Sequence, residues 1–240
     1  MKELRNTFRL RVSECDLTGR WRPGAMMIEM QETAGDHSSA VSCGRETLVK
    51  LGLAWVVARM EVRIHRIPAY GETLTVRTFH RPHRHRFFPR FFQVTDAAGE
   101  VLAEASSLWL LMDLETRQSV NADRLPVPLP DNSDMPELIP LPGAIQPLDS
   151  AGITREYRAV YTDLDANGHV NNTKYVDWLC DTMGAEAMRE HPLRQFTIHF
   201  NQEIRPEEPV TRQLRQEGTR FHMTGIHGGK NAFEISGETF

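Results

Sequence analysis

The chain has 240 residues, of which 25% are charged and 40% are hydrophobic. This composition excludes a disordered chain, a collagen and a low-complexity array, and the length allows one or two domains with a substantial core. The net charge of −4 argues against a general nucleic-acid binder. Three cysteines without a CxxC pair, no secretory signal and no apolar segment of membrane-spanning length predict a cytoplasmic protein.

The first half of the chain predicts a strand, a helix and then four strands. Residues 7–13 alternate like an edge strand, and residues 25–35 carry methionines at helical spacing. Asp96-Ala97-Ala98-Gly99 predicts a hairpin between the last two strands. The four strands, rich in β-branched and aromatic residues, are expected at 56–67, 72–80, 87–95 and 101–112.

The same order of elements returns after a proline-rich segment. Residues 125–150 hold seven prolines and are expected to form an extended, stiff linker. Beyond it the pattern predicts a strand at 155–161, a helix at 172–189 and a hairpin at Gly228-Gly229. Four further strands are expected at 196–204, 210–217, 220–226 and 232–240.

The two halves align with each other as an internal repeat. With an offset of 149, Phe8 falls on Tyr157, Asp16 on Asp165 and Met26 on Tyr175; after one shortening, 60–72 lies over 201–208 with Pro68 on Pro206. Two copies of a helix with antiparallel strands predict an α+β protein. We therefore expect an N-terminal domain at 1–124, the linker at 125–150 and a C-terminal domain at 151–240.

Polar side chains crowd the predicted strand-to-helix turn within DLDANGHVNNTKYVDW (163–178). Asp165, Asn167 and His169 alternate along this turn, and unpaired N–H groups of a helix N-terminus follow. Such groups can polarise a carbonyl, and an imidazole can move a proton near neutral pH. A structural interpretation competes, because Asp-Ala-Asn-Gly is a good turn and Asn171 or Asn172 a good helix cap.

A calcium loop is a further interpretation of this segment, since Asp163, Asp165 and Asn167 match the start of an EF-hand. Its twelfth position, however, is Lys174 instead of glutamate. The repeat favours chemistry. Asp16 retains the acid of Asp165, whereas Thr18 and Arg20 replace Asn167 and His169, an asymmetry that a purely structural turn would not need.

The segment resembles the signature of the acyl-acyl-carrier-protein thioesterases, roughly D-x-N-x-H-V-N-N-x-x-Y-x-x-W. SSLWLLMDLETRQSV (106–120) resembles that family's strand ending in W-x-L-x-D with a Thr-Arg turn, and FTIHFNQEIRP (196–206) its strand with a catalytic glutamate. The resemblance covers nearly the whole chain. It implies two tandem hotdog domains, each a long helix wrapped by an antiparallel sheet, with chain specificity set by the first domain and catalysis by the second.

The resemblance also implies catalytic roles for Asp165, Asn167, His169 and Glu203. The family's cysteine after that glutamate is absent, because the residue here is Ile204. A thiol nucleophile on that strand is therefore excluded, and we expect water to attack the thioester, activated by His169 with Glu203 or Asp165. The thioester carbonyl is expected to lie near the main-chain amides of Val170 and Asn171.

Two further regions carry expected binding roles. We expect the acyl chain to contact Met26, Met27, Met30 and Trp55, although these residues could equally be ordinary core. The segment HRPHRHRFFPRFF (80–92) suits an acidic carrier protein with its phosphate, and zinc, nucleic acid or a plain solvated face are its alternatives. The cations expected to dock the carrier are Arg81, Arg84, Arg86 and Arg90.

The resulting expectation is an acyl-carrier-protein hydrolase that releases free fatty acid and ends fatty acid synthesis. It requires no cofactor and no metal, its partner is acyl carrier protein, and it is a monomer or a homodimer. An acyl-CoA thioesterase of the same fold and a non-catalytic acyl-binding protein are the alternatives. Chain length and saturation are not encoded in any single motif.

Overall fold

The computed structural model describes residues 1–240 and divides them into two compact units. The first comprises residues 1–21 and 26–142, and the second comprises residues 22–25 and 143–240. No helix is both long enough and apolar enough to cross a membrane.

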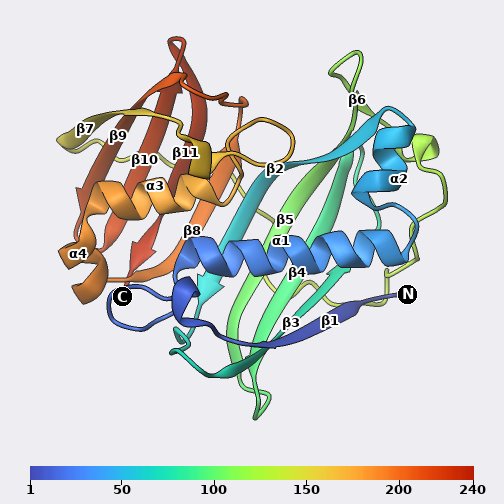
Figure 1. The fold of residues 1–240 in the computed structure, drawn as a ribbon, viewed down its shortest axis with the longest axis horizontal. Coiled ribbons are helices and arrows are strands. Elements are labelled where there is room, and N and C mark those ends of the chain that lie inside the picture. The colour runs from blue at the N-terminus through green and yellow to red at the C-terminus, as the bar shows by residue number, and fades with distance from the viewer. The chain divides into compact units, whose positions relative to one another are not determined.

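The first unit is an antiparallel sheet crossed by a long helix (Figure 1). Its strand order is β1-β3-β4-β5-β2, with the short β6 paired to β5. Two 3-10 turns, Val12–Glu14 and Ala122–Arg124, complete it. The elements are β1 Leu4–Arg9, α1 Pro23–Ala40, α2 Arg45–Lys50, β2 Leu53–Ile64, β3 Thr73–His80, β4 Phe87–Asp96, β5 Val101–Asp113 and β6 Ser119–Val120.

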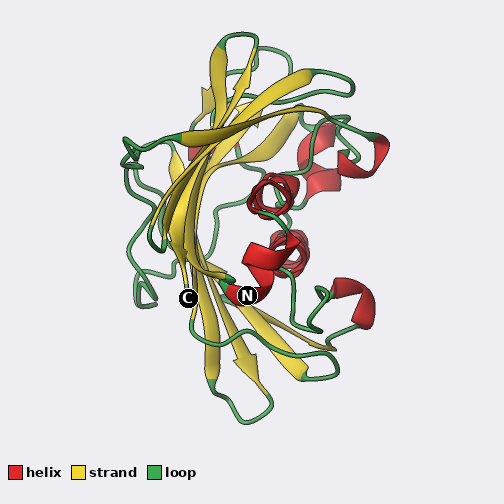
Figure 2. Ribbon diagram, turned by 90° about the vertical axis from the view of Figure 1, so that its left-hand side faces the viewer, coloured by secondary structure: helices red, strands yellow, loops and turns green.

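The second unit repeats this topology. Its strand order, β7-β9-β10-β11-β8, takes its strands in the same sequence as the first unit, and a 3-10 turn at Tyr161–Asp163 again follows the first strand. Its helices lie on one side of its strands (Figure 2). The elements are β7 Gly152–Arg158, α3 Lys174–Met183, α4 Ala185–Glu190, β8 Leu193–Phe200, β9 Pro209–Glu217, β10 Arg220–His227 and β11 Lys230–Thr239.

The helices differ most from the sequence expectation. The helix expected at 172–189 is two helices, because Gly184 between them adopts φ 97° and ψ 152°, a conformation open to glycine alone. The helix expected at 25–35 extends to Pro23–Ala40, and α2 was not expected at all. The strands lie within a few residues of their expected ranges, and both expected hairpins are present with glycines at positive φ.

Each unit has an aromatic core between helix and sheet. In the first, Phe79 and Phe91 face each other across β3 and β4 with ring centroids 5.6 Å apart. In the second, Trp178 on α3 is 1% exposed and packs near Phe233 of β11. Burying such rings is the main favourable term in folding and fixes each helix on its sheet.

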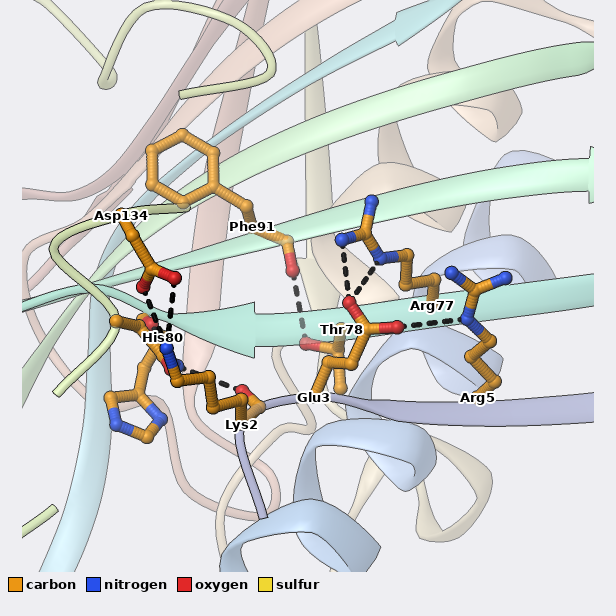
Figure 3. Close-up of polar contacts among 9 residues, drawn as sticks. Lys2, Glu3, Arg5, Arg77, Thr78, His80, Phe91 and Asp134 are labelled. Atoms are coloured by element: carbon orange, nitrogen blue, oxygen red, sulfur yellow. Dashed lines mark hydrogen bonds and ion pairs between the residues drawn. The ribbon is translucent and has the colours of Figure 1, made fainter. Parts of the chain in front are cut away.

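The segment expected to be a linker is instead packed against the first unit along its first half. It has no regular structure, yet Asn132 is fully buried and donates to the carbonyls of Lys2 and His80 at 2.8 Å. Asp134 pairs with Lys2, close to the Glu3 cluster with Arg5 and Arg77 (Figure 3). We call residues 125–142 the strap, because they pack over β1 and β3. The boundary between the two units falls after Pro142.

Candidate active site

The candidate site is built on a turn whose main-chain hydrogen bonds are the same in the two units. In the second unit, the amide of Asp165 donates to the carbonyl of His169 at 2.9 Å, and Gly168 donates back to Asp165 at 3.0 Å. In the first unit, Asp16, Arg20 and Gly19 make the same pair of bonds at 2.8 and 3.0 Å. The offset of 149 holds throughout, so the structure supports the internal repeat at atomic level.

The strand that follows the helix must be aligned differently from the sequence expectation. The amide of Val170 donates to the carbonyl of Ile204, and the equivalent amide of Trp21 donates to Pro68, both at 2.9 Å. Pro68 therefore corresponds to Ile204, and its expected match to Pro206 is wrong by two residues. The shortening between the halves is therefore two residues longer than the sequence indicated. Glu203 then corresponds to Ile67.

The side chains of His169 and Glu203 lie close together, beside the hydrogen bond between Val170 and Ile204. Nε2 of His169 lies 3.2 Å from Oε2 of Glu203, and the two side chains are 23% and 33% exposed. Val170 and Ile204, both buried, hold the two segments together at the next residue. An imidazole oriented by a carboxylate on one nitrogen presents its other nitrogen as a base, which is the arrangement that general base catalysis requires.

The carboxylate of Asp165 shapes the turn and orients Asn167. Its Oδ1 accepts the amide N–H of Asn167 at 2.7 Å, and its Oδ2 accepts the side-chain amide at 3.3 Å. In the first unit, Asp16 instead accepts the amide N–H groups of both Thr18 and Arg20 and the Thr18 hydroxyl. In the structure, His169 thus pairs with Glu203, whereas Asp165 accepts hydrogen bonds from Asn167.

The expectation that the amides of Val170 and Asn171 polarise a carbonyl is wrong in this structure. Val170 donates to Ile204, and Asn171 donates to the carbonyl of Asp163 at 2.8 Å. Each amide has one hydrogen to donate, so neither is available to a substrate. The side chain of Asn171 instead accepts the amide and hydroxyl of Thr173, both at 2.9 Å, as a cap before α3.

Asp163 serves the interior of the unit. Its carboxylate is buried and accepts the Tyr157 hydroxyl at 2.7 Å and the Val160 amide at 3.0 Å. Because Asp163 faces inward while Asp165 binds Asn167, the two carboxylates do not form a shared calcium site. No group of three or more His, Cys, Asp and Glu side chains is placed to hold a metal ion.

The residues expected to contact the acyl chain lie in the first unit. Met26, Met27 and Met30 are buried on α1. The indole of Trp55 donates to the carbonyl of Cys43 at 3.0 Å and packs edge-on against Phe88. Trp55 thus borders an apolar cluster between α2 and the sheet. Acyl contact by these four residues stays a prediction.

The docking role expected for Arg90 is wrong, because its side chain is inside the first unit. Arg90 is 9% exposed and donates to Nδ1 of His37 at 3.1 Å, to Ser38 and to Thr78. His37 therefore carries its proton on Nε2, towards the carbonyl of Met1. Burial, and then the Arg90 charge, lower the pKa of His37 and of the neighbouring His80 to about 4.

The other three arginines lie nearer the surface with partners of their own. Arg81 and Arg84 both pair with Glu137 of the strap, and Arg86 donates to the carbonyl and hydroxyl of Ser119. Glu137 thus partly neutralises the positive charge of Arg81 and Arg84. Carrier docking by these three residues stays a prediction.

The sequence did not indicate the structural roles of two residues near the site. It suggested a turn or a calcium loop at Asp163, and only the buried contacts of that side chain show what it supports. Tyr175, in the first turn of α3, is 3% exposed. Burial, and then the negative charges of Glu203 and Asp165, raise its pKa. The repeat itself held the signal, because the matching residue of the first half is Met26, which has no hydroxyl.

Comparison with known proteins places the chain in one family. Residues 1–124 match the acyl-ACP thioesterase N-terminal domain, and residues 147–236 match the C-terminal domain. A structure of an acyl-ACP thioesterase from Bacteroides thetaiotaomicron superposes with a TM-score of 0.85 at 22% identity, covering 99% of this chain and 98% of that one. That likeness concerns the fold.

Curated relatives agree. The chloroplastic acyl-[acyl-carrier-protein] hydrolase FATB2 of Cuphea viscosissima is 27% identical over 74% of this chain and 46% of its own length. The dodecanoyl-[acyl-carrier-protein] hydrolase of Cinnamomum camphora is 29% identical over 83% of this chain and 56% of its own. The chain thus spans about half the length of these relatives. With both family domains matched and the α+β double hotdog fold present, the chain belongs to the acyl-ACP thioesterase family.

Proposed function

We propose that this protein hydrolyses the thioester of fatty acyl-acyl-carrier protein, releasing free fatty acid and holo-carrier protein and so ending fatty acid synthesis. The observation that carries the proposal is the contact between Nε2 of His169, on the turn of the second unit, and Oε2 of Glu203, which follows β8. The family assignment and the relatives' names supply the substrate class.

In the proposed reaction, Glu203 orients His169 and stabilises its protonated form. Water bonds to the thioester carbon and gives its proton to His169, while the carbonyl electron pair moves onto the oxygen. The tetrahedral intermediate then collapses, the C–S bond breaks, and the leaving thiolate takes the proton from His169. Asp165 holds Asn167 towards this centre. General base catalysis of this kind contributes about 10²–10⁴-fold.

A thiol nucleophile has no support in the second unit. Cys180 is its only cysteine, and it lies on α3 where burial raises the thiol pKa far above its usual range. A thiol in such surroundings forms little of the thiolate that attacks a thioester. Water is therefore the nucleophile in this proposal.

The test is to incubate the purified protein with carrier proteins bearing dodecanoyl, palmitoyl and oleoyl chains, and to identify the released acids. The same chains on coenzyme A give the comparison that separates the proposal from an acyl-CoA thioesterase. We expect a higher kcat/KM for the carrier-linked series. Equal or lower values would favour the CoA enzyme, and binding without release would favour an acyl-binding protein.

The proposed contact with the carrier uses Arg81, Arg84 and Arg86 of the first unit. Replacing Arg84 and Arg86 by glutamate should raise KM for carrier-linked substrate and leave KM for a free thioester analogue nearly unchanged, because charge complementarity acts on the carrier alone. Arg45, an exposed arginine on α2, offers a matched charge reversal. Equal effects on the two substrates would reject the docking surface.

A further inference from the structure

Tyr175 is 3% exposed, and its hydroxyl forms no hydrogen bond within the protein. Its oxygen is not among the fully buried side-chain atoms that lack a partner, so part of the small exposed area of this residue belongs to the hydroxyl. Tyr157 of the same unit instead donates its hydroxyl to Asp163. The hydroxyl of Tyr175 is therefore able to donate to a bound molecule.

The ring of Tyr175 is fixed by aromatic neighbours. Its centroid lies 4.5 Å from that of Phe233, 5.2 Å from Trp178 and 5.7 Å from Phe200. Phe200 ends β8, three residues before Glu203, and Tyr175 lies in the first turn of α3, six residues after His169. A ring held on several sides cannot swing its hydroxyl away to reach a distant partner.

The hydroxyl lies within electrostatic range of two carboxylates of the site. Burial, and then the negative charges of Glu203 and Asp165, raise the pKa of Tyr175. The group is therefore a neutral O–H donor at neutral pH. A fixed neutral donor beside a base can receive the negative charge that develops on a carbonyl oxygen.

The internal repeat separates this function from packing. The equivalent of Tyr175 in the first unit is Met26, equally buried at 1% exposure. A methionine fills the same place beneath the same type of turn, so the fold needs no hydroxyl there. The hydroxyl occurs only in the unit that also has His169 and Glu203.

We propose that Tyr175 is a catalytic residue whose hydroxyl donates a hydrogen bond to the thioester carbonyl oxygen as it becomes an oxyanion. The proposal rests on the thioesterase function above and supplies a donor where the amides of Val170 and Asn171 are already occupied. In the balanced reaction, Tyr175 transfers no proton. It stabilises the charge that appears when water attacks and disappears when the C–S bond breaks.

The experiment compares Tyr175→Phe with the wild type on dodecanoyl-acyl-carrier protein. We expect kcat to fall about 10²-fold, as for the loss of one oxyanion donor, with KM changed by less than about threefold. The melting temperature should stay the same, because phenylalanine keeps the three ring contacts. Tyr161→Phe is the matched control on the neighbouring turn, where the side chain is 90% exposed, and should leave kcat unchanged.

A second measurement keeps the outcome independent of folding. A long-chain alkyl trifluoromethyl ketone mimics the tetrahedral oxyanion, whereas the corresponding thioether has no carbonyl. Tyr175→Phe should weaken binding of the ketone by about 10²-fold and leave the thioether unaffected. Unchanged kcat, or ketone and thioether affinities that fall together, would overturn the role of Tyr175. A wild type that releases no acid would instead reject the proposed function.

Discussion

The turn at 12–21 in the first unit and the turn at 161–170 in the second have the same backbone and different chemistry. Both place a 3-10 turn, an aspartate and a positive-φ glycine in the same order, with matching hydrogen bonds. In the first, Arg20 bonds Thr18 and lies near Asp16, so the polar groups satisfy one another. In the second, His169 reaches beyond the turn to Glu203.

This comparison shows which parts of the site are scaffold. The carboxylates of Asp16 and Asp165 accept equivalent amides and are needed wherever the turn occurs. Among the positions that differ, four have proposed chemical roles, and there Asn167, His169, Tyr175 and Glu203 replace Thr18, Arg20, Met26 and Ile67. The proposed activity therefore depends on side chains placed on a backbone turn that also forms without them in the first unit.

The largest expected difference between the two turns is the effect on kcat of replacing His169 and Arg20 separately. His169→Ala should lower kcat about 10²–10⁴-fold, because the general base is lost, whereas Arg20→Ala should leave kcat within about twofold. Steady-state release of acid from dodecanoyl-acyl-carrier protein measures both. Hydrolysis that survives Asp165→Ala, Asn167→Ala, His169→Ala and Glu203→Ala would discard the site.

Acid should act on the first unit through His37 and His80. Their pKa is about 4 when folded and about 6.5 when unfolded. Above pH 6.5 both states are neutral, and between pH 6.5 and 4 only the unfolded chain takes up the protons. Stability should therefore fall by roughly 3 kcal/mol per histidine across that window.

Urea unfolding between pH 7.5 and pH 4 measures this loss. The double variant His37→Gln with His80→Gln should flatten the pH dependence by the share of the two residues, whatever its stability at pH 7.5. A variant whose curve remains parallel to that of the wild type would show that these histidines are not responsible.

Asp163 and Glu14 provide the next contrast, because they occupy equivalent positions and cap equivalent amides. Asp163 is buried and also accepts the Tyr157 hydroxyl, whereas Glu14 is only partly buried. Asp163→Asn should destabilise the protein by about 2 kcal/mol, and Glu14→Gln by less than about 0.5 kcal/mol. Thermal unfolding of the two variants side by side tests the expectation, and equal losses would contradict it.

The smallest expected effect concerns Glu207, which holds φ 61° where its counterpart Gly71 holds 86°. Their amides donate to Ala159 and Leu10, which confirms the equivalence. Glu207→Gly should stabilise the protein by about 1 kcal/mol by relieving a left-handed conformation, and Gly71→Ala should destabilise it by a similar amount. Denaturant midpoints of the pair check both signs.

Periodicity and repeat symmetry were enough to predict most of the fold. Alternating apolar residues located the strands, and the offset of 149 found the two turns because both keep Asp, Gly and the same spacing. The break at Gly184 and the helix α2 were not predicted. A single glycine inside a helical pattern is usually tolerated, so Gly184 did not indicate the end of a helix. The misplaced Pro68 shows that proline identity is a weaker guide than backbone hydrogen bonds.

At the site, the sequence could name side chains but not their partners. His169 was expected to work with Asp165 or Glu203, and only the fold brings Glu203 to 3.2 Å. The occupied amides of Val170 and Asn171 depend on contacts between segments distant in the chain. Arg90 looked like a surface cation because strand alternation does not reveal that a strap and a helix cover its side of the sheet.

The strap has a practical consequence for dividing the polypeptide. A cut at residue 124, where the family domain ends, would separate Asn132 from the N-terminal fragment. The carbonyls of Lys2 and His80 would then lose their donor, and the hydroxyl of Ser106 would lose the carbonyl of Pro140. A cut after Pro142 keeps all three bonds within one fragment. Separate expression or circular permutation of the halves should therefore begin the C-terminal piece at Gly143.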